Sequence, residues 1–324
     1  MRRDPIHFRA FRVTVWWTLA LLFLGSVVHA TGSSLACPDW PTCHGSFLPA
    51  MEGGVFWEHL HRLVAGGLIL MFGLATWLVR REEPGRPWLF KLSLAGVALL
   101  LVQAVFGGLT VLLRLPDAVS TTHLGLALLF LMLAVSLGAA TAPKDARAEL
   151  DTRSRGALRV WATAAAGIVF VQSLLGGVVR HMEAGLACPD VPKCLGQWVP
   201  PFLNPWITVH FAHRTLGVLT LTLVVLAAAR LYALTRSRQV RRTAAAAGAL
   251  VILQVGLGFL SVSSGLSVLA VSLHTVAAAS LLAVLVLLAC WGWLPASSAV
   301  PPNPAASGSE RQRGGPVGAH HGRR

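Results

Sequence analysis

Eight long apolar stretches dominate this chain and limit what it can fold into. Each can cross a hydrocarbon core of about 30 Å as a helix, which takes roughly 20 residues. A helix also satisfies its backbone hydrogen bonds within one segment, as lipid requires. The predicted spans are 13–30, 57–79, 92–113, 118–142, 160–179, 208–229, 243–262 and 268–294. We therefore expect an all-α protein embedded in membrane lipid.

The basic residues are distributed unevenly about these spans. Of the 27 Lys and Arg residues, 22 lie in the N-terminus, in alternate loops and in the C-terminal segment. This asymmetry follows the positive-inside rule and predicts a multi-pass protein of the bacterial cell membrane with both termini cytoplasmic. The net charge of +14 is explained by topology and does not require nucleic acid. Segment 295–324 is rich in Pro, Gly, Ser and Ala and is predicted to be a disordered cytoplasmic tail.

The chain also contains an internal duplication. The motif "LACPDWPTCHG" at 35–45 returns as "LACPDVPKCLG" at 186–196, an offset of 151 residues. Four spans fall in each repeat, so both repeats enter the membrane with the same orientation. We expect two tandem four-helix bundles, 1–145 and 146–294, related by a pseudo-twofold axis along the membrane normal.

Two cysteine pairs lie in the repeated loops, which the charge pattern places outside the membrane. The pairs are Cys37 with Cys43 and Cys188 with Cys194. An oxidising outer compartment favours a disulfide within each pair. The alternative is metal binding by the thiols, but a gap of five residues containing two prolines suits a small closed loop better than a metal knuckle.

Four histidines are repeated inside the predicted spans. They are His61, His123, His213 and His274, and all stand near the outer end of their spans, at about one depth. A single histidine in a span is more often a hydrogen-bonded interior residue or part of a proton path. Two symmetric pairs, one for each four-helix unit, favour two haem sites, each with iron ligated by two imidazoles: His61 with His123, and His213 with His274.

The neighbours of these histidines differ between the repeats. Arg62 and Arg214 each follow a histidine and are candidates to pair with haem propionates, with snorkelling to lipid headgroups as the alternative. Glu58 stands three residues before its histidine, where the second repeat has His210. Glu58 is either solvated, paired with Arg62, or placed for proton transfer and stabilisation of positive charge. This difference favours chemistry in the N-terminal half.

Six motifs together resemble the heme A synthase family, whose members convert heme O to heme A in the membrane. The motifs are "CPDWPTC", "EHLHR", "GGLTV", "TTHLG", "HFAHR" and "SLHT", and the resemblance covers about residues 10–294. It implies oxidation of a porphyrin methyl group to a formyl group by successive hydroxylations, with oxygen from water. Electrons then pass to an external acceptor, and the substrate suggests a complex with the farnesyltransferase that produces heme O.

The resemblance also implies a role for each site residue. Glu58, His61 and His123 would form the heme O site, and His213 with His274 would ligate a haem b cofactor. The Cys37–Cys43 disulfide would lie near the catalytic pocket, whereas Cys188–Cys194 would be structural.

Three other classes of protein are compatible with parts of the sequence. A b-type electron-transfer cytochrome would also use bis-histidine haems, but it gives Glu58 no special place. A membrane thiol-disulfide oxidoreductase usually carries a Cys-X-X-Cys pair and needs no repeated histidines. A transporter with a histidine proton path would be expected to have charged residues and broken helices near the midplane.

Overall fold

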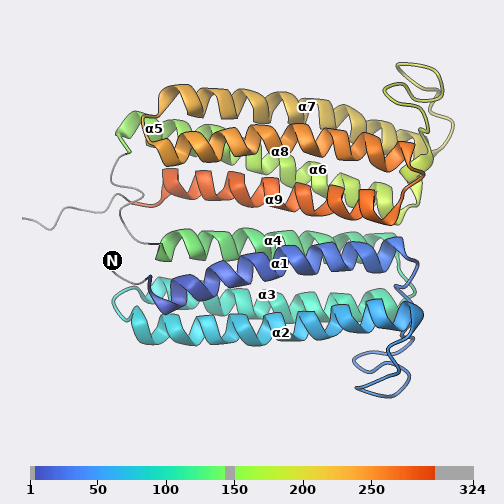
Figure 1. The fold of residues 1–324 in the computed structure, drawn as a ribbon, viewed down its shortest axis with the longest axis horizontal. Coiled ribbons are helices and arrows are strands. Elements are labelled where there is room, and N and C mark those ends of the chain that lie inside the picture. The colour runs from blue at the N-terminus through green and yellow to red at the C-terminus, as the bar shows by residue number, and fades with distance from the viewer. Residues whose placement is uncertain (1–3, 143–149, 296–324) are drawn as a thin grey trace, which may run out of the picture. The chain divides into compact units, whose positions relative to one another are not determined.

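The computed structural model describes residues 4–142 and 150–295, and regular structure within these ranges is helical apart from one isolated β-bridge in each cysteine loop. Eight segments are long and apolar enough to cross a membrane, which confirms the eight predicted spans. Figure 1 shows these helices lying side by side. The α-helices are α1 (Ile6–Ala30), α2 (Gly53–Glu82), α3 (Pro87–Leu112), α4 (Asp117–Thr141), α5 (Thr152–Ala157), α6 (Thr163–His181), α7 (Pro205–Leu234), α8 (Arg238–Ser263) and α9 (Val268–Trp293).

Several helices extend beyond the apolar stretch that predicted them. The first span begins at Ile6 rather than at residue 13, and the second runs from Gly53 to Glu82 rather than over 57–79. Arg, Lys and Glu are good helix formers, so the hydrogen-bond ladder continues into the charged residues beside the apolar core. Hydropathy therefore locates the spans but not the ends of the helices.

The fifth span, Thr152–His181, is not a uniform α-helix. The Asp151 side chain caps α5 by accepting a hydrogen bond from the Ser154 N–H, which is the usual role of Asp before a helix. A π-helical turn over Leu158–Ala162 then joins α5 to α6. Helix α9 packs against this π-helical turn as well as against α6, so the turn forms part of the contact between the fifth span and α9.

Helices α1, α4, α6 and α9 contact one another, and they hold the remaining helices in place. Helices α2 and α3 pack beside α1 and α4, while α7 and α8 pack beside α6 and α9, as Figure 1 shows. In the first group, Phe72 stacks between Phe11 and Phe130, with ring centroids 5.9 and 4.9 Å apart. Lipid is as apolar as these side chains, so close packing is what holds such helices together.

The loops after α1 and α6 lie at the same end of the helices in Figure 1. Each contains a disulfide bond, Cys37–Cys43 in the first loop and Cys188–Cys194 in the second, as the sequence predicted. The predicted boundary between the repeats at residue 145, and residues 296–324 of the predicted tail, lie outside the described residues.

Candidate functional site

The four repeated histidines have closely similar surroundings. Each is the seventh or ninth residue of its helix, and each imidazole packs against a glycine of the preceding helix. A Cβ added to the glycine would lie 3.0 Å from the ring at Gly25 and His61, 3.0 Å at Gly107 and His123, 2.9 Å at Gly176 and His213, and 3.1 Å at Gly258 and His274. The glycines therefore form one cradle for each imidazole.

A cradle this close fixes the position of the ring. Carbon atoms in contact are normally about 3.5–4.0 Å apart, so an alanine in place of any of these glycines would displace the imidazole. The rings also form pairs. His61 lies within electrostatic range of His123, and His213 of His274. Ligation of one haem by each pair stays a prediction.

Three glutamines contact these histidines. The amide nitrogen of each lies beside an imidazole. Gln103 Nε2 is 3.5 Å from Nε2 of His123, Gln254 Nε2 is 3.3 Å from Nε2 of His274, and Gln172 Nε2 is 3.1 Å from Nδ1 of His213. The sequence signal was there, since each glutamine precedes its cradle glycine by four residues, one helical turn away.

Several polar atoms at these sites are buried without a partner. They are the side-chain oxygens of all three glutamines and Nδ1 of His61 and of His123, none of which has a hydrogen-bond partner among the described residues. Buried polar atoms are rarely left unpaired, so their presence indicates a place for a further group. Imidazole pairs are strong axial ligands for haem iron. The residues present therefore fit a haem between the histidines of each pair.

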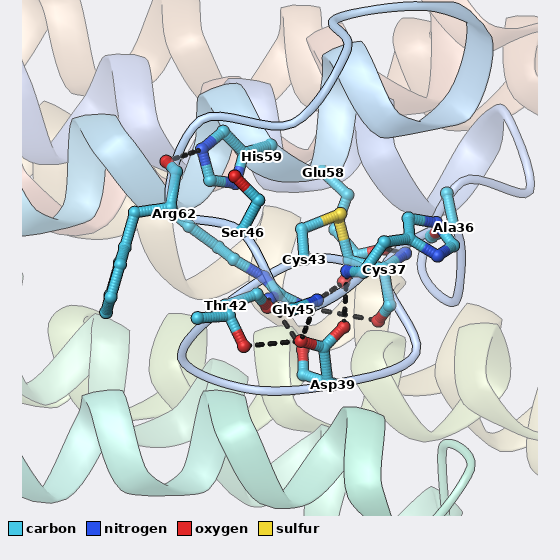
Figure 2. The surroundings of a disulfide bond; sticks show 12 residues. Ala36, Cys37, Asp39, Thr42, Cys43, Gly45, Ser46, Glu58, His59 and Arg62 are labelled. Carbon is cyan, nitrogen blue, oxygen red and sulfur yellow. Dashed lines mark hydrogen bonds and ion pairs between the residues drawn. A yellow bond between two sulfur atoms is a disulfide. The ribbon is translucent and has the colours of Figure 1, made fainter.

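The first cysteine loop is organised around Asp39, which lies beneath the Cys37–Cys43 bond in Figure 2. Its carboxylate accepts hydrogen bonds from the Thr42 hydroxyl and from the amides of His44 (2.6 Å) and Gly45 (2.9 Å). These donors, the Thr42 hydroxyl foremost, lower the pKa of the Asp39 carboxyl to about 2. A charged Asp39 therefore closes the loop.

Arg62 of α2 fastens this loop to the helices. Its guanidinium donates to the main-chain oxygens of Asp39 (2.8 Å), Thr42 (2.6 Å) and Cys37 (3.2 Å). It also donates to Oε1 of Glu58 at 2.6 Å. At least four hydrogen bonds of Arg62 are therefore used within the protein, beneath the disulfide and beside the first histidine of the pair.

Glu58 is buried, with 4% of its surface exposed. Oε1 pairs with Arg62, and Oε2 accepts a 2.8 Å hydrogen bond from the Cys37 N–H. Of the readings considered from the sequence, the structure thus shows the pairing with Arg62 and does not show a solvated carboxylate. Glu58 also links the disulfide loop directly to the helix that carries His61, one turn away.

The second cysteine loop is held in the same way by Arg214. This residue donates to the main-chain oxygens of Asp190 (2.7 Å), Lys193 (2.8 Å) and Cys188. In place of Glu58 it meets His210, whose Nε2 accepts from Arg214 Nε at 3.1 Å. His210 Nδ1 donates to the Ala184 carbonyl at 2.8 Å, so this imidazole is neutral. Among the described residues, this guanidinium forms no ion pair equivalent to that of Arg62 with Glu58.

The alternative of metal binding by the cysteines finds little support in this geometry. Cys37, Cys43 and His59 have ligand atoms within 4.8 Å of one another. The two sulfur atoms are bonded to each other, however, and a metal requires the thiolate form of cysteine. His59 instead donates from Nε2 to the Phe47 carbonyl at 3.0 Å.

A polar cluster at the loop end was not indicated by the duplication. His29 of α1 and His181 of α6 have ring centroids 5.5 Å apart. Arg180 donates to the hydroxyl and the main-chain oxygen of Ser26 at 3.0 and 2.7 Å. A cavity of about 820 Å³ lies beside this cluster, lined by both histidines and by Arg114. The two histidines have no histidine counterpart at the repeat offset, so the repeat pattern did not single them out.

Comparison with known proteins gives a consistent result. The chain matches the COX15-CtaA family, described as cytochrome oxidase assembly protein, over residues 52–286. It is 32% identical to the heme A synthase of Shewanella oneidensis, over 89% of this chain and 97% of that protein. It is 31% identical to the heme A synthase of Symbiobacterium thermophilum (79% and 85%) and 29% identical to that of Staphylococcus saprophyticus (77% and 83%).

Proposed function

The chain belongs to the COX15-CtaA family, and from this premise we propose that it is a heme A synthase, an oxidoreductase that converts heme O to heme A. The similarity to several proteins of that name covers most of both chains. In this reaction a methyl group and one water give a formyl group, four electrons and four protons. Successive hydroxylations with oxygen from water satisfy that balance, with the electrons passing to an external acceptor.

The observation that carries this proposal is the pair of duplicated imidazole cradles. Four half-buried histidines, each packed against a glycine, stand at equivalent places of a duplicated chain, and each of two pairs lies within electrostatic range. We assign His61 and His123 to the substrate heme O, and His213 and His274 to a resident haem b. When bound, haem b supplies a site for one-electron transfer.

Glu58 distinguishes the proposed substrate site from the cofactor site. It is the acidic side chain one turn from His61, while the equivalent position holds the neutral His210. A carboxylate fixed by Arg62 and the Cys37 N–H is preorganised, so it can stabilise positive charge at the substrate edge without moving. We assign to Glu58 the stabilisation of the positive charge at the substrate edge that water attacks.

The loop above each histidine pair closes the proposed sites. We propose that the Cys37–Cys43 loop covers the substrate site and that Cys188–Cys194 is structural. Pairing of Arg62 and Arg214 with haem propionates stays a prediction. The contacts of both guanidinium groups with loop carbonyls favour a first role in holding the loops.

The same proposal includes the arrangement of the whole chain. We propose two tandem four-helix bundles, 1–145 and 146–294, related by a pseudo-twofold axis along the membrane normal. The basic loops and both termini would face the bacterial cytoplasm, with the cysteine loops outside. A partner that delivers heme O, namely the farnesyltransferase that makes it, would spare the substrate from water.

A b-type electron-transfer cytochrome is the second candidate, because it too would use two histidine pairs. It predicts two equivalent, tightly held haems. The difference between Glu58 and His210 favours the synthase.

The test is to identify the haems bound to the purified protein from cells that make heme O, by chromatography and mass. Wild type should contain heme A or its hydroxylated precursor. Glu58→Ala should accumulate heme O, and His274→Ala should lose haem b. Finding only haem b in all three samples, at two per chain in wild type, would exclude the synthase and establish the cytochrome.

A further inference from the structure

One position breaks the repeat of glutamines that contact the histidines. In α3, α6 and α8, a glutamine precedes the cradle glycine by four residues: Gln103 and Gly107, Gln172 and Gly176, Gln254 and Gly258. In α1 the residue four before Gly25 is Leu21. Leu21 and Gln172 are equivalent at the offset of 151 residues, so the two halves differ at this position of the histidine sites.

The consequence is visible at His213 and His61. Gln172 Nε2 lies 3.1 Å from Nδ1 of His213 and donates to its main-chain oxygen at 2.9 Å. Nδ1 of His61 is buried and has no hydrogen-bond partner in the part of the chain that the structure describes. Leu21 has no polar atom to offer. Nδ1 of His213 therefore has a side-chain partner, and Nδ1 of His61 does not.

The other histidine of each pair differs between the halves in the same direction, but its neighbouring glutamine does not. Gln103 and Gln254 approach Nε2 of His123 and His274 at 3.5 and 3.3 Å, and both are glutamine. The main-chain oxygen of Gln254 accepts from Nδ1 of His274 at 3.1 Å, whereas Nδ1 of His123 is buried without a hydrogen-bond partner among the described residues. Nδ1 therefore has a partner in both histidines of the second pair and in neither histidine of the first. The difference in side chain lies at one position, Leu21 against Gln172, because Gln103 and Gln254 are both glutamine.

We propose that Gln172 is a positioning residue that retains the haem of the His213–His274 pair, and that Leu21 makes the haem of the His61–His123 pair exchangeable. This inference rests on the proposed function, because it takes one haem as a cofactor and the other as a substrate. A cofactor must stay bound through many turnovers. A substrate must enter, and its product must leave.

The physical basis is the effect of a hydrogen bond on the far nitrogen of a ligating imidazole. Iron at Nε2 leaves the ring hydrogen on Nδ1, and an acceptor there orients the ring and increases its basicity as a ligand. In the structure the amide nitrogen of Gln172 faces Nδ1, and its oxygen has no partner among the described residues. With iron at Nε2, turning the amide would present this oxygen to Nδ1–H and would give up the hydrogen bond to the His213 main-chain oxygen. Removal of such a partner typically weakens metal binding by about 10–100-fold.

The test is a reciprocal exchange, Gln172→Leu and Leu21→Gln, in the full-length protein. Haem b dissociation is measured by transfer to excess apomyoglobin, and haem content is measured by extraction. We expect Gln172→Leu to release haem b about tenfold faster or more, and Leu21→Gln to retain additional haem, up to roughly twice the content per chain. Gln254→Leu serves as the matched control for loss of a glutamine beside the same pair, on its Nε2 side.

Two further measurements separate a positioning role of Gln172 from a merely structural role. Gln172→Glu keeps an acceptor at the same reach, so it should retain haem b and lower its midpoint potential, whereas Gln172→Leu should raise the potential. A gain in retention by Leu21→Gln cannot arise from misfolding. Equal dissociation rates in wild type and Gln172→Leu, or no gain in Leu21→Gln, would overturn the inference. Equal haem content in wild type and His274→Ala would instead overturn the proposed function.

Discussion

The two cysteine loops are built alike, but the helix beneath each one presents a different group. Arg62 and Arg214 bind three equivalent main-chain oxygens in their respective loops. Under the first loop the guanidinium meets the carboxylate of Glu58, and under the second it meets the neutral imidazole of His210. The loop scaffold therefore does not need the carboxylate. The second loop keeps the same contacts without a carboxylate, so Glu58 is not needed to hold the loop. For this reason we assign chemistry to the first half.

The largest expected effect comes from removing that carboxylate's charge. Glu58→Gln should lower the formation of heme A by about 10²–10³-fold, because a preorganised charge facing the developing cation is lost. Product formed per haem-loaded protein is the measurement. His210→Gln is the matched control in the other half and should stay within about tenfold of wild type. A normal rate in Glu58→Gln would remove the proposed distinction between the halves.

Stability should respond to the two arginines unequally. Arg62→Ala leaves Glu58 buried without its cation and should cost about 3–5 kcal/mol of unfolding free energy. Arg214→Ala loses hydrogen bonds beside a neutral His210 and should cost only about 1–3 kcal/mol. Denaturation in detergent measures both. Adding Glu58→Gln to Arg62→Ala should recover part of the loss, and equal costs for the two single variants would show that the carboxylate does not matter to the loop.

Alanine substitution of the cradle glycines should reduce haem content similarly in both halves, unlike the unequal effects expected for the loop arginines. Gly176→Ala places a Cβ 2.9 Å from the His213 ring and should reduce haem b content about tenfold, since the ligand ring must shift. Haem per chain is the readout. Gly167→Ala, in the same helix, is the control, because nothing lies within 4 Å of its Cβ. Full haem content in Gly176→Ala would mean that the cradle does not set the ring position.

The smallest effect concerns the pH range over which the first loop stays closed. The carboxyl of Asp39 has a pKa of about 2 in the folded protein, against an ordinary value of 3.8. A lowered pKa means that its contribution is present above pH 3.8 and is lost as the pH falls through about 2. Thr42→Ala should shift that loss upward by about one pH unit. In the second loop the residue equivalent to Thr42 is Lys193.

Reduction of the Cys37–Cys43 bond by a phosphine between pH 2 and pH 5 would report this opening. The Cys188–Cys194 bond in the same molecule provides an internal control for the reagent. If Thr42→Ala left the pH profile of the first bond unchanged, Asp39 would not be the group that closes the loop.

The sequence by itself determined the spans, the duplication, the disulfide pairs and the set of four repeated histidines. Lipid imposes a minimum helix length, and duplication imposes a constant offset, so both can be read along a single chain. The histidines could be identified because all four are repeated in type and in depth.

Only the tertiary structure decided what each of these residues touches. Gly25 is one glycine among 31 in the sequence, and only the packing of α1 against α2 places it against the His61 ring. The bonds of Arg62 to three loop carbonyls depend equally on the fold, because main-chain oxygens have no sequence signature. Periodicity and repeats carry information along the chain, whereas a contact between helices depends on their rotation and separation, which side-chain packing sets.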